Sequence, residues 1–483
     1  MDIRPILFPL SGLLAALALL MEIPALFDYF VHNSEWEAFQ VSALITLFAA
    51  GVLYIGRDRN MSHFSLRHGY LFTVLCWILL PLFAALPFFW STQDMSYTDS
   101  VFETISGLTT TGATVMSGLE YLPPGILLWR ALLQWVGGIG IVVMAISIFP
   151  VLKTGGMQLF QLESSETAGK VFPRIQDVAS GVFAIYSALT VLCGLIYFIA
   201  GMSAFDAVVH AMTTLSTGGF SNTDMSFAAF PDKTIIWTGS LFMLLGSLPF
   251  SLMLFSLRGK NRWVLFADRQ VQIYLLFLFF TCFFCATMFH IIMKNEDFFD
   301  SLTLATFNVI SVVTTTGYAF EDYTLWGAFA PVLFFFLTFV GGCSGSTAGG
   351  IKMFRFHVMW LSFQKQFGHL IFPKGVFVQK INGKPLHNDI SQSVLIYLTL
   401  LIFSFAVLAT ALSFTGLDMI TALSGAATSL SNVGPGLGEI IGPAGNFKTL
   451  PDSAKWILDI GMILGRLEYV TVVVLFQVSF WRF

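Results

Sequence analysis

The sequence predicts an all-α polytopic membrane protein, and three observations lead to that fold class. Of its 483 residues, 56% are hydrophobic and only 11% are charged, less than half of the roughly 25% charge of average soluble domains. Segments of about 20 mainly apolar residues, the length that crosses a bilayer as a helix, recur along the chain. One polar, glycine-containing pattern also occurs four times between these segments.

The same composition excludes several classes of function. A soluble enzyme and a disordered scaffold both need charged surface that this chain lacks. The net charge of −4 offers no basic patch, so no nucleic-acid partner is expected. The five cysteines lie in apolar or glycine-rich surroundings and predict no disulfide framework.

The apolar segments predict ten membrane spans, the eighth of which is too long for one crossing and contains a glycine-rich interruption. These spans cover about 6–30, 38–56, 69–91, 126–150, 178–201, 234–257, 271–293, 328–361, 391–415 and 455–480. Shorter, more polar segments are interpreted as re-entrant half-helices, which occur at membrane depth only where protein or water surrounds them. They cover about 99–110, 206–216, 300–315 and 418–431.

The basic residues predict the orientation of these spans. Ten spans place both termini on one side, and 18 of the 24 Lys and Arg residues fall on that side, against four on the other and two within spans. Because loops rich in Lys and Arg stay in the cytoplasm, both termini are expected there. The opposite face is acidic, which would concentrate cations outside.

The repeated pattern divides the chain. Each copy follows a half-helix that starts at or near an aspartate, a residue that favours a helix start: Asp99, Asp206, Asp300 and Asp418. Two full spans separate successive copies, so all four loops enter from the same face. We expect two additional spans in residues 1–60, followed by parallel span–half-helix–span repeats around a pseudo-fourfold pore at 61–160, 161–262, 263–385 (with an intramembrane loop at 341–350) and 386–483.

The composition of the loops suits a dehydrated monovalent cation. Rings of backbone carbonyls replace the water shell of such an ion, and glycine permits the backbone angles that aim carbonyls at one axis. The alternative is that the loops are ordinary external loops or small-residue helix contacts. The candidate ion-binding residues are Thr110, Thr111, Gly112, Ser216, Thr217, Gly218, Thr315, Thr316, Gly317, Asn432, Val433 and Gly434.

At these residues the chain resembles the superfamily of potassium transporters that includes the bacterial Trk and Ktr systems and the plant and fungal HKT and Trk proteins. The two additional spans, the Gly341–Lys352 stretch and the Gly465-Arg466-Leu467-Glu468 stretch are more similar to the bacterial TrkH/TrkG type. The fourth loop departs from the Thr-Thr-Gly pattern. Some relatives carry serine at the first-loop glycine and conduct sodium, so the resemblance implies potassium selectivity with Gly112.

The interruption in the eighth span has five glycines within residues 341–350. Each glycine costs a helix about 1 kcal/mol relative to alanine. A phosphate-binding loop is excluded because Ile351 separates the last glycine from Lys352. A simple kink is one alternative; the favoured hypothesis, which the resemblance also implies, is a gating loop below the filter. Its candidate residues are Gly345, Ser346, Thr347, Gly349 and Gly350.

Several polar residues fall inside helical segments. Arg466 is interpreted either as half of an ion pair with an acid such as Glu468 or Glu22, or as an electrostatic barrier to cations below the filter. Arg130 is placed near the external end of its span, where it could extend its charge to the surface. Glu103 and His210 lie in the first two half-helices and are expected to support the filter from behind rather than to bind cations.

The function expected from these features is potassium uptake through the filter, under the control of the intramembrane loop. The resemblance implies a homodimer in the bacterial inner membrane, regulated by a cytoplasmic TrkA-type ring that binds nucleotide, whereas this chain would carry no covalent cofactor. Candidate contacts with that ring are Lys153, Arg174, Arg262 and Lys365. Two alternatives remain: a symporter of the Ktr or HKT kind coupled to sodium or protons, and a lipid-modifying membrane enzyme, for which no acid and histidine cluster is found.

Overall fold

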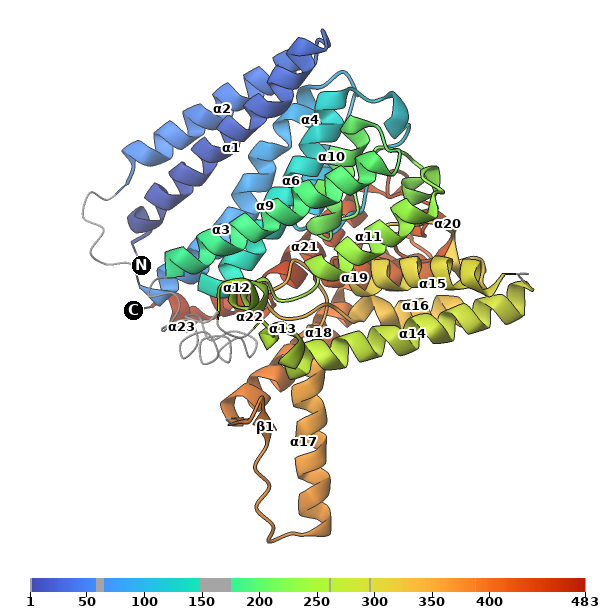
Figure 1. Cartoon of the computed structure of the whole chain (residues 1–483). Helices are drawn as coiled ribbons and strands as arrows, with labels where there is room; N and C mark the ends of the chain where they lie inside the picture. Colours follow the sequence, from blue (N-terminus) through green and yellow to red (C-terminus); the bar gives the residue numbers. More distant parts are fainter. Residues whose placement is uncertain are drawn as a thin grey trace.

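The computed structural model describes residues 2–57, 65–147, 175–259, 262–294, 297–386 and 388–482. Among these residues, seven helices are long and apolar enough to cross a membrane, and an eighth crossing is possible as a bent helix pair. Figure 1 shows these helices packed around loops at the centre of the molecule. The prediction of an all-α polytopic membrane fold is therefore confirmed.

Two helices precede the repeats and lie at one side of the molecule (Figure 1). They are α1 (Arg4–Phe30) and α2 (Trp36–Ile55). Helix α1 packs against α2 and also against the first and last helices of the first repeat. This pair leaves a large part of its apolar surface exposed, as expected for helices that face lipid.

Each repeat begins with a long helix, continues with a half-helix and ends with a second helix. The long helices are α3 (Leu66–Ala84, extended by α4, Leu86–Trp90), α9 (Ile175–Ile199), α14 (Arg269–Met293) and α18 (Asn388–Phe414). The half-helices are α5 (Tyr97–Leu108), α10 (Ala204–Leu215), α15 (Phe298–Val313) and α19 (Met419–Ser431). All four half-helices lie within a few residues of their predicted positions.

The aspartates at the half-helix starts do not all act in the same way. Asp418 caps its helix directly, as expected, by accepting hydrogen bonds from the amides of Ile420 and Thr421. In α5 and α10 the capping residue is instead a serine three positions earlier, Ser96 or Ser203. Asp99 and Asp206 therefore occupy the first turn, where a negative charge still favours the positive end of the helix dipole.

The second helices are α6 (Pro124–Ser147), α11 with α12 (Lys233–Gly246, Phe250–Arg258), α16 with α17 (Phe329–Phe339, Met353–Ile371) and α21 with α22 (Asp452–Arg466, Val470–Val473). Each half-helix packs against the second helix of the preceding repeat: α10 on α6, α15 on α11, α19 on α16, and α5 on α21. The last of these contacts closes the circle, so the four repeats surround one axis.

The predicted interruption of the eighth span is confirmed, but the sixth and tenth predicted spans are wrong as continuous helices. Helices α11 and α12 meet at an angle of 90°. Pro249 stands at this bend, and proline has no amide hydrogen for a continuing helix. In the tenth span the helix ends after Arg466, because Glu468 and Tyr469 adopt positive φ angles of 60° and 44°. Three of the four second helices are therefore broken.

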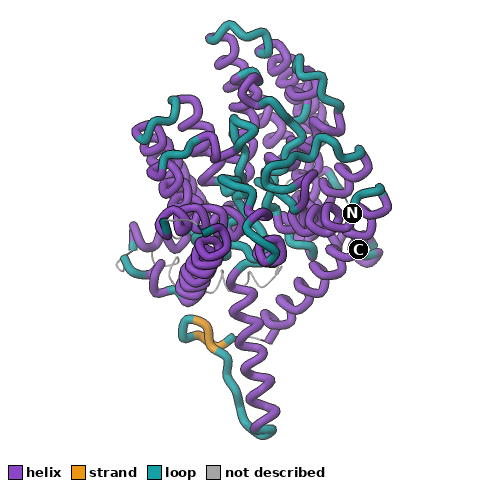
Figure 2. Tube along the Cα trace, turned by 90° about the vertical axis from the view of Figure 1, so that its right-hand side faces the viewer, coloured by secondary structure: helices purple, strands orange, loops and turns teal. Residues whose placement is uncertain are grey.

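Helix α17 projects away from the body of the molecule together with a short hairpin (Figures 1 and 2). The hairpin pairs β1 (Lys380–Ile381) with β2 (Lys384–Pro385) through a turn at Asn382-Gly383. This turn was not predicted, although Asn-Gly between two short strands is a strong hairpin signal. The remaining short helices are α13 (Val264–Ala267), α20 (Gly438–Ile441) and α23 (Val478–Trp481).

Some sequence predictions fall outside the described residues, and one assignment of basic residues needs correction. The boundaries after residues 60 and 160, and the candidate contacts Lys153 and Arg174, lie outside the described residues. Lys352 and Arg355 were counted among the charges of cytoplasmic loops, but both side chains are buried inside the protein. Burial of two basic residues near the interrupted helix indicates a functional or structural role beyond topology.

Candidate functional site

The four loops after the half-helices share one backbone geometry. The first residue of each loop adopts a left-handed conformation, with φ of 54° at Thr110, 51° at Thr217, 59° at Thr315 and 56° at Asn432. The amide of the next residue donates to a carbonyl five positions earlier, over distances of 2.8 to 3.1 Å. Two positions after the left-handed residue, each loop has a glycine with positive φ: Gly112, Gly219, Gly317 and Gly434. The loops are thus structurally equivalent, residue by residue.

This equivalence corrects the alignment of the second loop by one position. The sequence pattern matched Gly218 to Gly112, whereas in the structure Gly219 has the corresponding positive φ of 77°. Gly218 instead takes the place of Thr111, since its amide donates to Thr213 as that of Thr111 donates to Ser106. Ser216 likewise falls one position before the left-handed residue, at the end of α10.

The four equivalent glycines form a closed ring. In it, each glycine faces the carbonyl of the residue that precedes the equivalent glycine in a neighbouring loop. A Cβ atom added to Gly112 would lie less than 3.0 Å from the carbonyl oxygen of Gly218, a distance that real Cβ atoms essentially never show. Gly219 faces Thr316 in the same way, Gly317 faces Val433, and Gly434 faces Thr111. Because each loop meets the next and the fourth meets the first, only glycine fits at these positions.

The ring lies at the ends of the four half-helices. The residues directly before the ring glycines are buried, whereas Gly112, Gly219 and Gly317 are partly exposed. The carbonyl end of a helix carries partial negative charge. The ring therefore places backbone oxygens, threonine hydroxyls and four negative helix ends around one axis. Of the 12 candidate ion-binding residues, 11 occupy the three equivalent positions of the loops, from the left-handed residue to the glycine. Ser216 is the exception, because it lies one residue before them.

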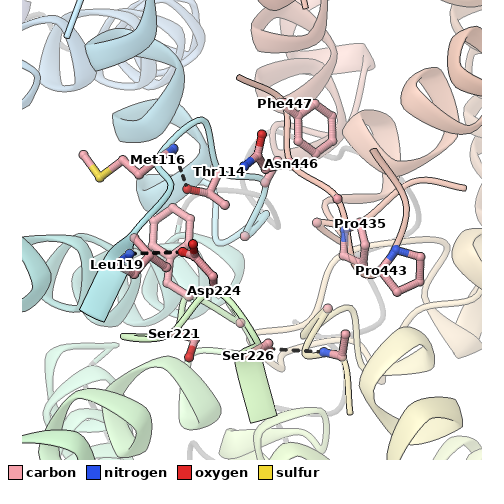
Figure 3. Close-up of a pocket in the computed structure, with 18 of the residues that line it drawn as sticks. Thr114, Met116, Leu119, Ser221, Asp224, Ser226, Pro435, Pro443, Asn446 and Phe447 are labelled. Atoms are coloured by element: carbon pink, nitrogen blue, oxygen red, sulfur yellow. Dashed lines mark hydrogen bonds between the residues drawn. The ribbon is translucent and has the colours of Figure 1, made fainter. Parts of the chain in front are cut away.

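A cavity of about 190 Å³ lies against the ring. It is lined by the four ring glycines and by the segments that follow them in all four repeats, including Phe220, Asp224 and Asn446. Figure 3 shows these segments converging from different parts of the chain. Asp224 joins two of them, because its carboxylate accepts hydrogen bonds from the amides of Gly118 (2.7 Å) and Leu119 (3.0 Å). All four loops thus share this cavity.

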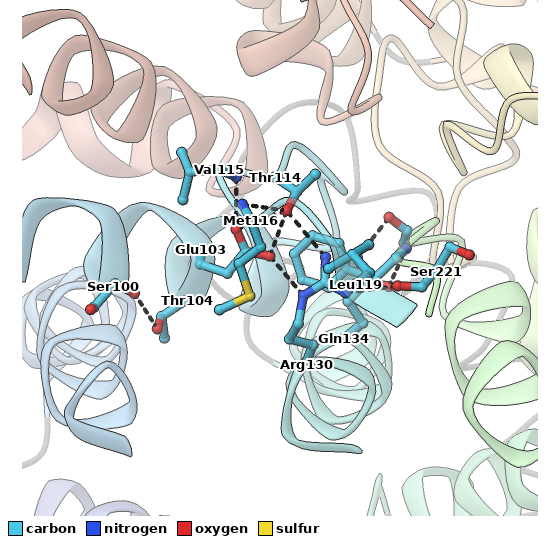
Figure 4. A network of polar contacts seen from close by, with 12 residues as sticks. Ser100, Glu103, Thr104, Thr114, Val115, Met116, Leu119, Arg130, Gln134 and Ser221 are labelled. Atoms are coloured by element: carbon cyan, nitrogen blue, oxygen red, sulfur yellow. Dashed lines mark hydrogen bonds and ion pairs between the residues drawn. The ribbon is translucent and has the colours of Figure 1, made fainter. Parts of the chain in front are cut away.

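Arg130, which lines this cavity, forms a buried ion pair with Glu103 (Figure 4). Nε of Arg130 lies 2.8 Å from Glu103, and its Nη1 donates to the carbonyl of Ser221 in the second loop. Glu103 accepts a further bond from the amide of Val115 in the first loop. Arg130 is only 1% exposed, so the expectation that it extends to the surface is wrong. The pair instead connects the first and second loops.

Two further side chains hold the second loop from behind. His210 bonds through Nε2 to the hydroxyl of Ser221 at 3.0 Å, as expected for a supporting role. Gln134 was not singled out in the sequence. Its amide nitrogen donates to the carbonyl of Gly218 (2.7 Å), and its oxygen accepts from the amide of Phe220 (3.1 Å). A lone glutamine within an apolar span was the available signal.

The glycine-rich segment between α16 and α17 lies against the other end of the loops. The amide of Gly349 donates to the hydroxyl of Thr315 (2.6 Å), and that of Gly350 donates to the carbonyl of Ser431 (2.8 Å). Thr347 lies within 3.1 Å of the carbonyl of Leu215 and of the hydroxyl of Thr217. The segment therefore contacts the second, third and fourth loops.

The bend between α11 and α12 makes room for this segment and binds it. The carbonyls of Gly246 and Ser247, which have no helical partner at the bend, accept hydrogen bonds from the amides of Thr347 (3.2 Å) and Cys343 (2.9 Å). The amide of Phe250, at the start of α12, donates to Gly345. The glycine-rich segment that interrupts the eighth span thus supplies the hydrogen-bond partners that the sixth span lacks at its bend.

Arg466 lies beside the same segment. It lines a cavity of about 20 Å³, room for about one water, together with Gly345, Gly349 and Asn432. Its side chain is 3% exposed, and its Nε and Nη2 atoms have no hydrogen-bond partner among the described residues. The proposed ion pair with Glu468 is not found, because Glu468 pairs with Arg355 at 2.7 Å. An unpaired guanidinium thus lies next to the interruption.

The Arg355–Glu468 pair joins two of the broken helices. Arg355 is in the first turn of α17 and Glu468 is in the break after α21. The guanidinium of Arg355 also lies 3.7 Å from the ring centre of Tyr397 in α18. Removing one partner of such a buried pair leaves an uncompensated charge. The pair therefore fixes the position at which the chain leaves the glycine-rich segment.

Comparison with known proteins identifies the family of this arrangement. Residues 37–481 match the model of the family TrkH, described as a cation transport protein. The chain belongs to the TrkH family. The chain is therefore a transport protein rather than an enzyme.

The TrkH relatives match over nearly the whole chain. The Trk system potassium uptake protein TrkI of Halomonas elongata is 48% identical over 99% of this chain and 97% of its own length. The corresponding protein TrkH of Escherichia coli K12 is 35% identical, over 96% of both chains. The crystal structure of the potassium transporter TrkH from Vibrio parahaemolyticus matches with a TM-score of 0.91 at 32% identity, over 100% of both chains.

Proposed function

We propose that this chain takes up potassium across the bacterial inner membrane through the ring of four loops. The observation that carries the proposal is the closed ring of glycines and carbonyls, in which Gly112, Gly219, Gly317 and Gly434 each meet the next loop. Carbonyl rings replace the hydration shell of potassium. The potassium uptake systems named among the relatives support the choice of ion.

The roles of individual residues follow from this geometry. The carbonyls of Thr111, Gly218, Thr316 and Val433, one per repeat, face the ring glycines and supply one layer of ligands. Thr110, Thr217, Thr315 and Asn432 precede them and supply the layer nearer the half-helix ends. Gly112 is essential because a serine side chain at this position would displace the carbonyl of Gly218 and weaken selection against sodium.

Rubidium flux into liposomes with sodium competition tests this assignment. Wild-type protein should carry Rb⁺ in preference to Na⁺, and Gly112→Ser should lose that preference while still conducting. If neither protein distinguishes Rb⁺ from Na⁺, the filter assignment fails. A sodium gradient that drives Rb⁺ uptake against its own gradient would instead support the coupled symporter.

The glycine-rich segment and Arg466 are proposed as the gate. The segment presses against three filter loops, and the unpaired guanidinium of Arg466 would repel a cation leaving the ring. Deleting residues 344–349 should raise Rb⁺ flux. Arg466→Gln should raise it as well, whereas Arg466→Lys keeps the charge and should stay low. Equal flux in both Arg466 variants would show that its charge is not the barrier.

Orientation, partner and assembly complete the proposal: cytoplasmic termini, a TrkA-type nucleotide-binding ring and a homodimer. Arg262 and Lys365 remain candidate contacts with the ring. All five cysteines are buried, so one introduced cysteine can report the side of the membrane. In intact cells, an impermeant thiol reagent should label Thr449→Cys and spare Lys374→Cys. The reverse result would invert the topology.

A further inference from the structure

A third cavity lies where α14 and α17 meet the hairpin, and it is lined by none of the four loops. Its volume is about 690 Å³. The polar side chains that line it are Arg269 at the start of α14, His357 and Gln364 on α17, and Lys380 and Asn382 on the hairpin. None of the described residues that line it is acidic. The cavity therefore favours an anion.

The hairpin holds one wall of this cavity in place. Asn382, at the turn, donates from its side chain to Asp268 (2.8 Å) and accepts from the amide of Arg269 (3.1 Å). Asn382 and Gly383 adopt φ angles of 49° and 80°, as a tight hairpin turn requires. These contacts bring Lys380 to the same cavity as Arg269. The carboxylate of Asp268 is engaged, since it also caps α14 through the amide of Val271.

His357 provides a second, independent indication of a ligand. Its side chain is 8% exposed and lines the cavity. The Nδ1 atom is buried and has no hydrogen-bond partner among the described residues. Buried polar atoms are nearly always hydrogen-bonded. Nδ1 is shielded from the cavity in this ring orientation, and a turn of the ring toward the cavity would let a phosphate oxygen between the two basic side chains supply the missing partner.

The position of the cavity distinguishes a lipid from a soluble anion. Arg269 is the first residue of α14, a membrane-spanning helix of 25 residues, so the cavity opens at the membrane boundary. Exposed aromatic side chains surround this point: Trp263 (72% exposed), Phe266 (52%) and Trp360 (62%). Tryptophan concentrates at the headgroup level of a bilayer. Basic pockets between transmembrane helices at that level bind anionic headgroups.

We propose that this cavity binds the phosphate of an anionic lipid headgroup. Arg269 and Lys380 neutralise its charge, and His357 donates the remaining hydrogen bond. In the proposed orientation the lipid belongs to the cytoplasmic leaflet. The site holds the hairpin, α14 and α17 to the membrane surface, and it does not depend on which ion the filter loops select.

Binding of phosphatidylglycerol to the full-length protein in detergent, measured by native mass spectrometry, tests the proposal. The comparison lipid is phosphatidylcholine, whose headgroup has no net charge. The double variant Arg269→Gln, Lys380→Gln should bind phosphatidylglycerol roughly 30-fold more weakly, since each basic residue at a membrane surface contributes about a factor of five. Lys374→Gln is the matched control, because Lys374 is exposed and does not line the cavity.

Two further arms separate the remaining possibilities. His357→Phe keeps a ring of similar size without the donor and should weaken phosphatidylglycerol binding while leaving the melting temperature without lipid unchanged. Inorganic phosphate added as a competitor should not displace the lipid. Equal binding of both lipids, equal binding by the double variant, or displacement by phosphate would each overturn the lipid assignment. If the double variant does not fold, Arg269→Lys with Lys380→Arg should retain full binding.

Discussion

The two halves of each repeat differ in how closely they follow the fourfold pattern. The half-helices and the loops after them share backbone angles and hydrogen bonds in all four copies. The second helices do not: α6 is continuous, α11 and α12 meet at 90°, and the third and fourth are interrupted at different points. One half of the repeat is symmetric, and the other is not.

This difference separates two tasks. A ring that surrounds an ion on one axis needs equivalent contributions from each side, so the loops keep one geometry. A segment that blocks the path below the ring needs to come from one direction only. The glycine-rich segment, which we propose for this task, comes from the third repeat alone and lies against the bend at Pro249 and the break after Arg466. Symmetry is retained where the ring closes and lost where the proposed gate lies.

The largest effect is expected from breaking the ring at the position that the structure reassigned. Gly219→Ser should abolish the preference for Rb⁺ over Na⁺ in liposome flux, because the new side chain would collide with the carbonyl of Thr316. Gly416→Ser is the control. Gly416 also has a positive φ, of 90°, but no atom lies within 4 Å of its added Cβ. Equal loss of selectivity in both variants would mean that backbone strain alone is responsible.

A smaller but substantial effect is expected behind the ring. Glu103→Gln leaves Arg130 buried without its counter-charge, which typically costs about 3–5 kcal/mol, so thermal melting in detergent should show a large loss of stability. Lys233→Gln removes the exposed pair between Lys233 and Asp300, whose side chains are 55% and 42% exposed. Surface pairs contribute about 1 kcal/mol or less. Comparable losses in the two variants would contradict a structural role for the buried pair.

On the asymmetric side, removing one hydroxyl should loosen the gate. Thr347→Val eliminates the contacts of Thr347 with Leu215 and Thr217 and should raise Rb⁺ flux about fivefold, the equivalent of a net hydrogen-bond contribution of about 1 kcal/mol. Thr338→Val is matched to it, since this buried hydroxyl bonds only within α16. Unchanged flux in Thr347→Val would place the obstruction elsewhere.

The smallest effect is expected at the start of the fourth half-helix. Asp418→Ala removes the cap of α19 and should cost about 1 kcal/mol. Hydrogen bonds from Thr421 lower the pKa of the Asp418 carboxyl. A lowered pKa means that this carboxylate stabilises the fold above its usual pKa of about 3.9, and that the contribution is lost as pH falls through the lower folded-state pKa. Asp418→Asn should retain the cap but show no such pH dependence; melting curves across this range compare the three proteins.

The symmetric half of the repeats was largely predictable from sequence. The half-helices could be placed because a short apolar segment, an acidic start and a polar, glycine-containing loop coincide in each copy. The second loop was misaligned by one residue because Gly218 and Gly219 are adjacent, and the pattern does not show which of them has the positive φ. The structure distinguishes them, because only Gly219 of the two adopts a positive φ, of 77°.

The asymmetric half was less predictable. Hydropathy runs through Ser247 and Pro249 and through residues 467–469, so both segments resemble ordinary spans. The first break is stable because its free carbonyls and amide find partners in the glycine-rich segment, and at the second break Glu468 pairs with Arg355; local sequence reveals neither contact. Glu468 pairs with Arg355 rather than with Arg466, its neighbour in sequence. This pairing also depends on tertiary structure and could not be predicted from local sequence.

The contact that closes the ring has a consequence for biosynthesis. The side chain of Asn432 bonds to the hydroxyl of Thr111 across 321 positions of the sequence. A single chain is made from its N-terminus, and domains fold as they emerge. The first loop must therefore wait, without its neighbour, until almost the entire protein has been synthesised and inserted. A chain truncated before the fourth repeat would lack the loop that both the first and the third loops contact, so an incomplete translation product would have no closed ring.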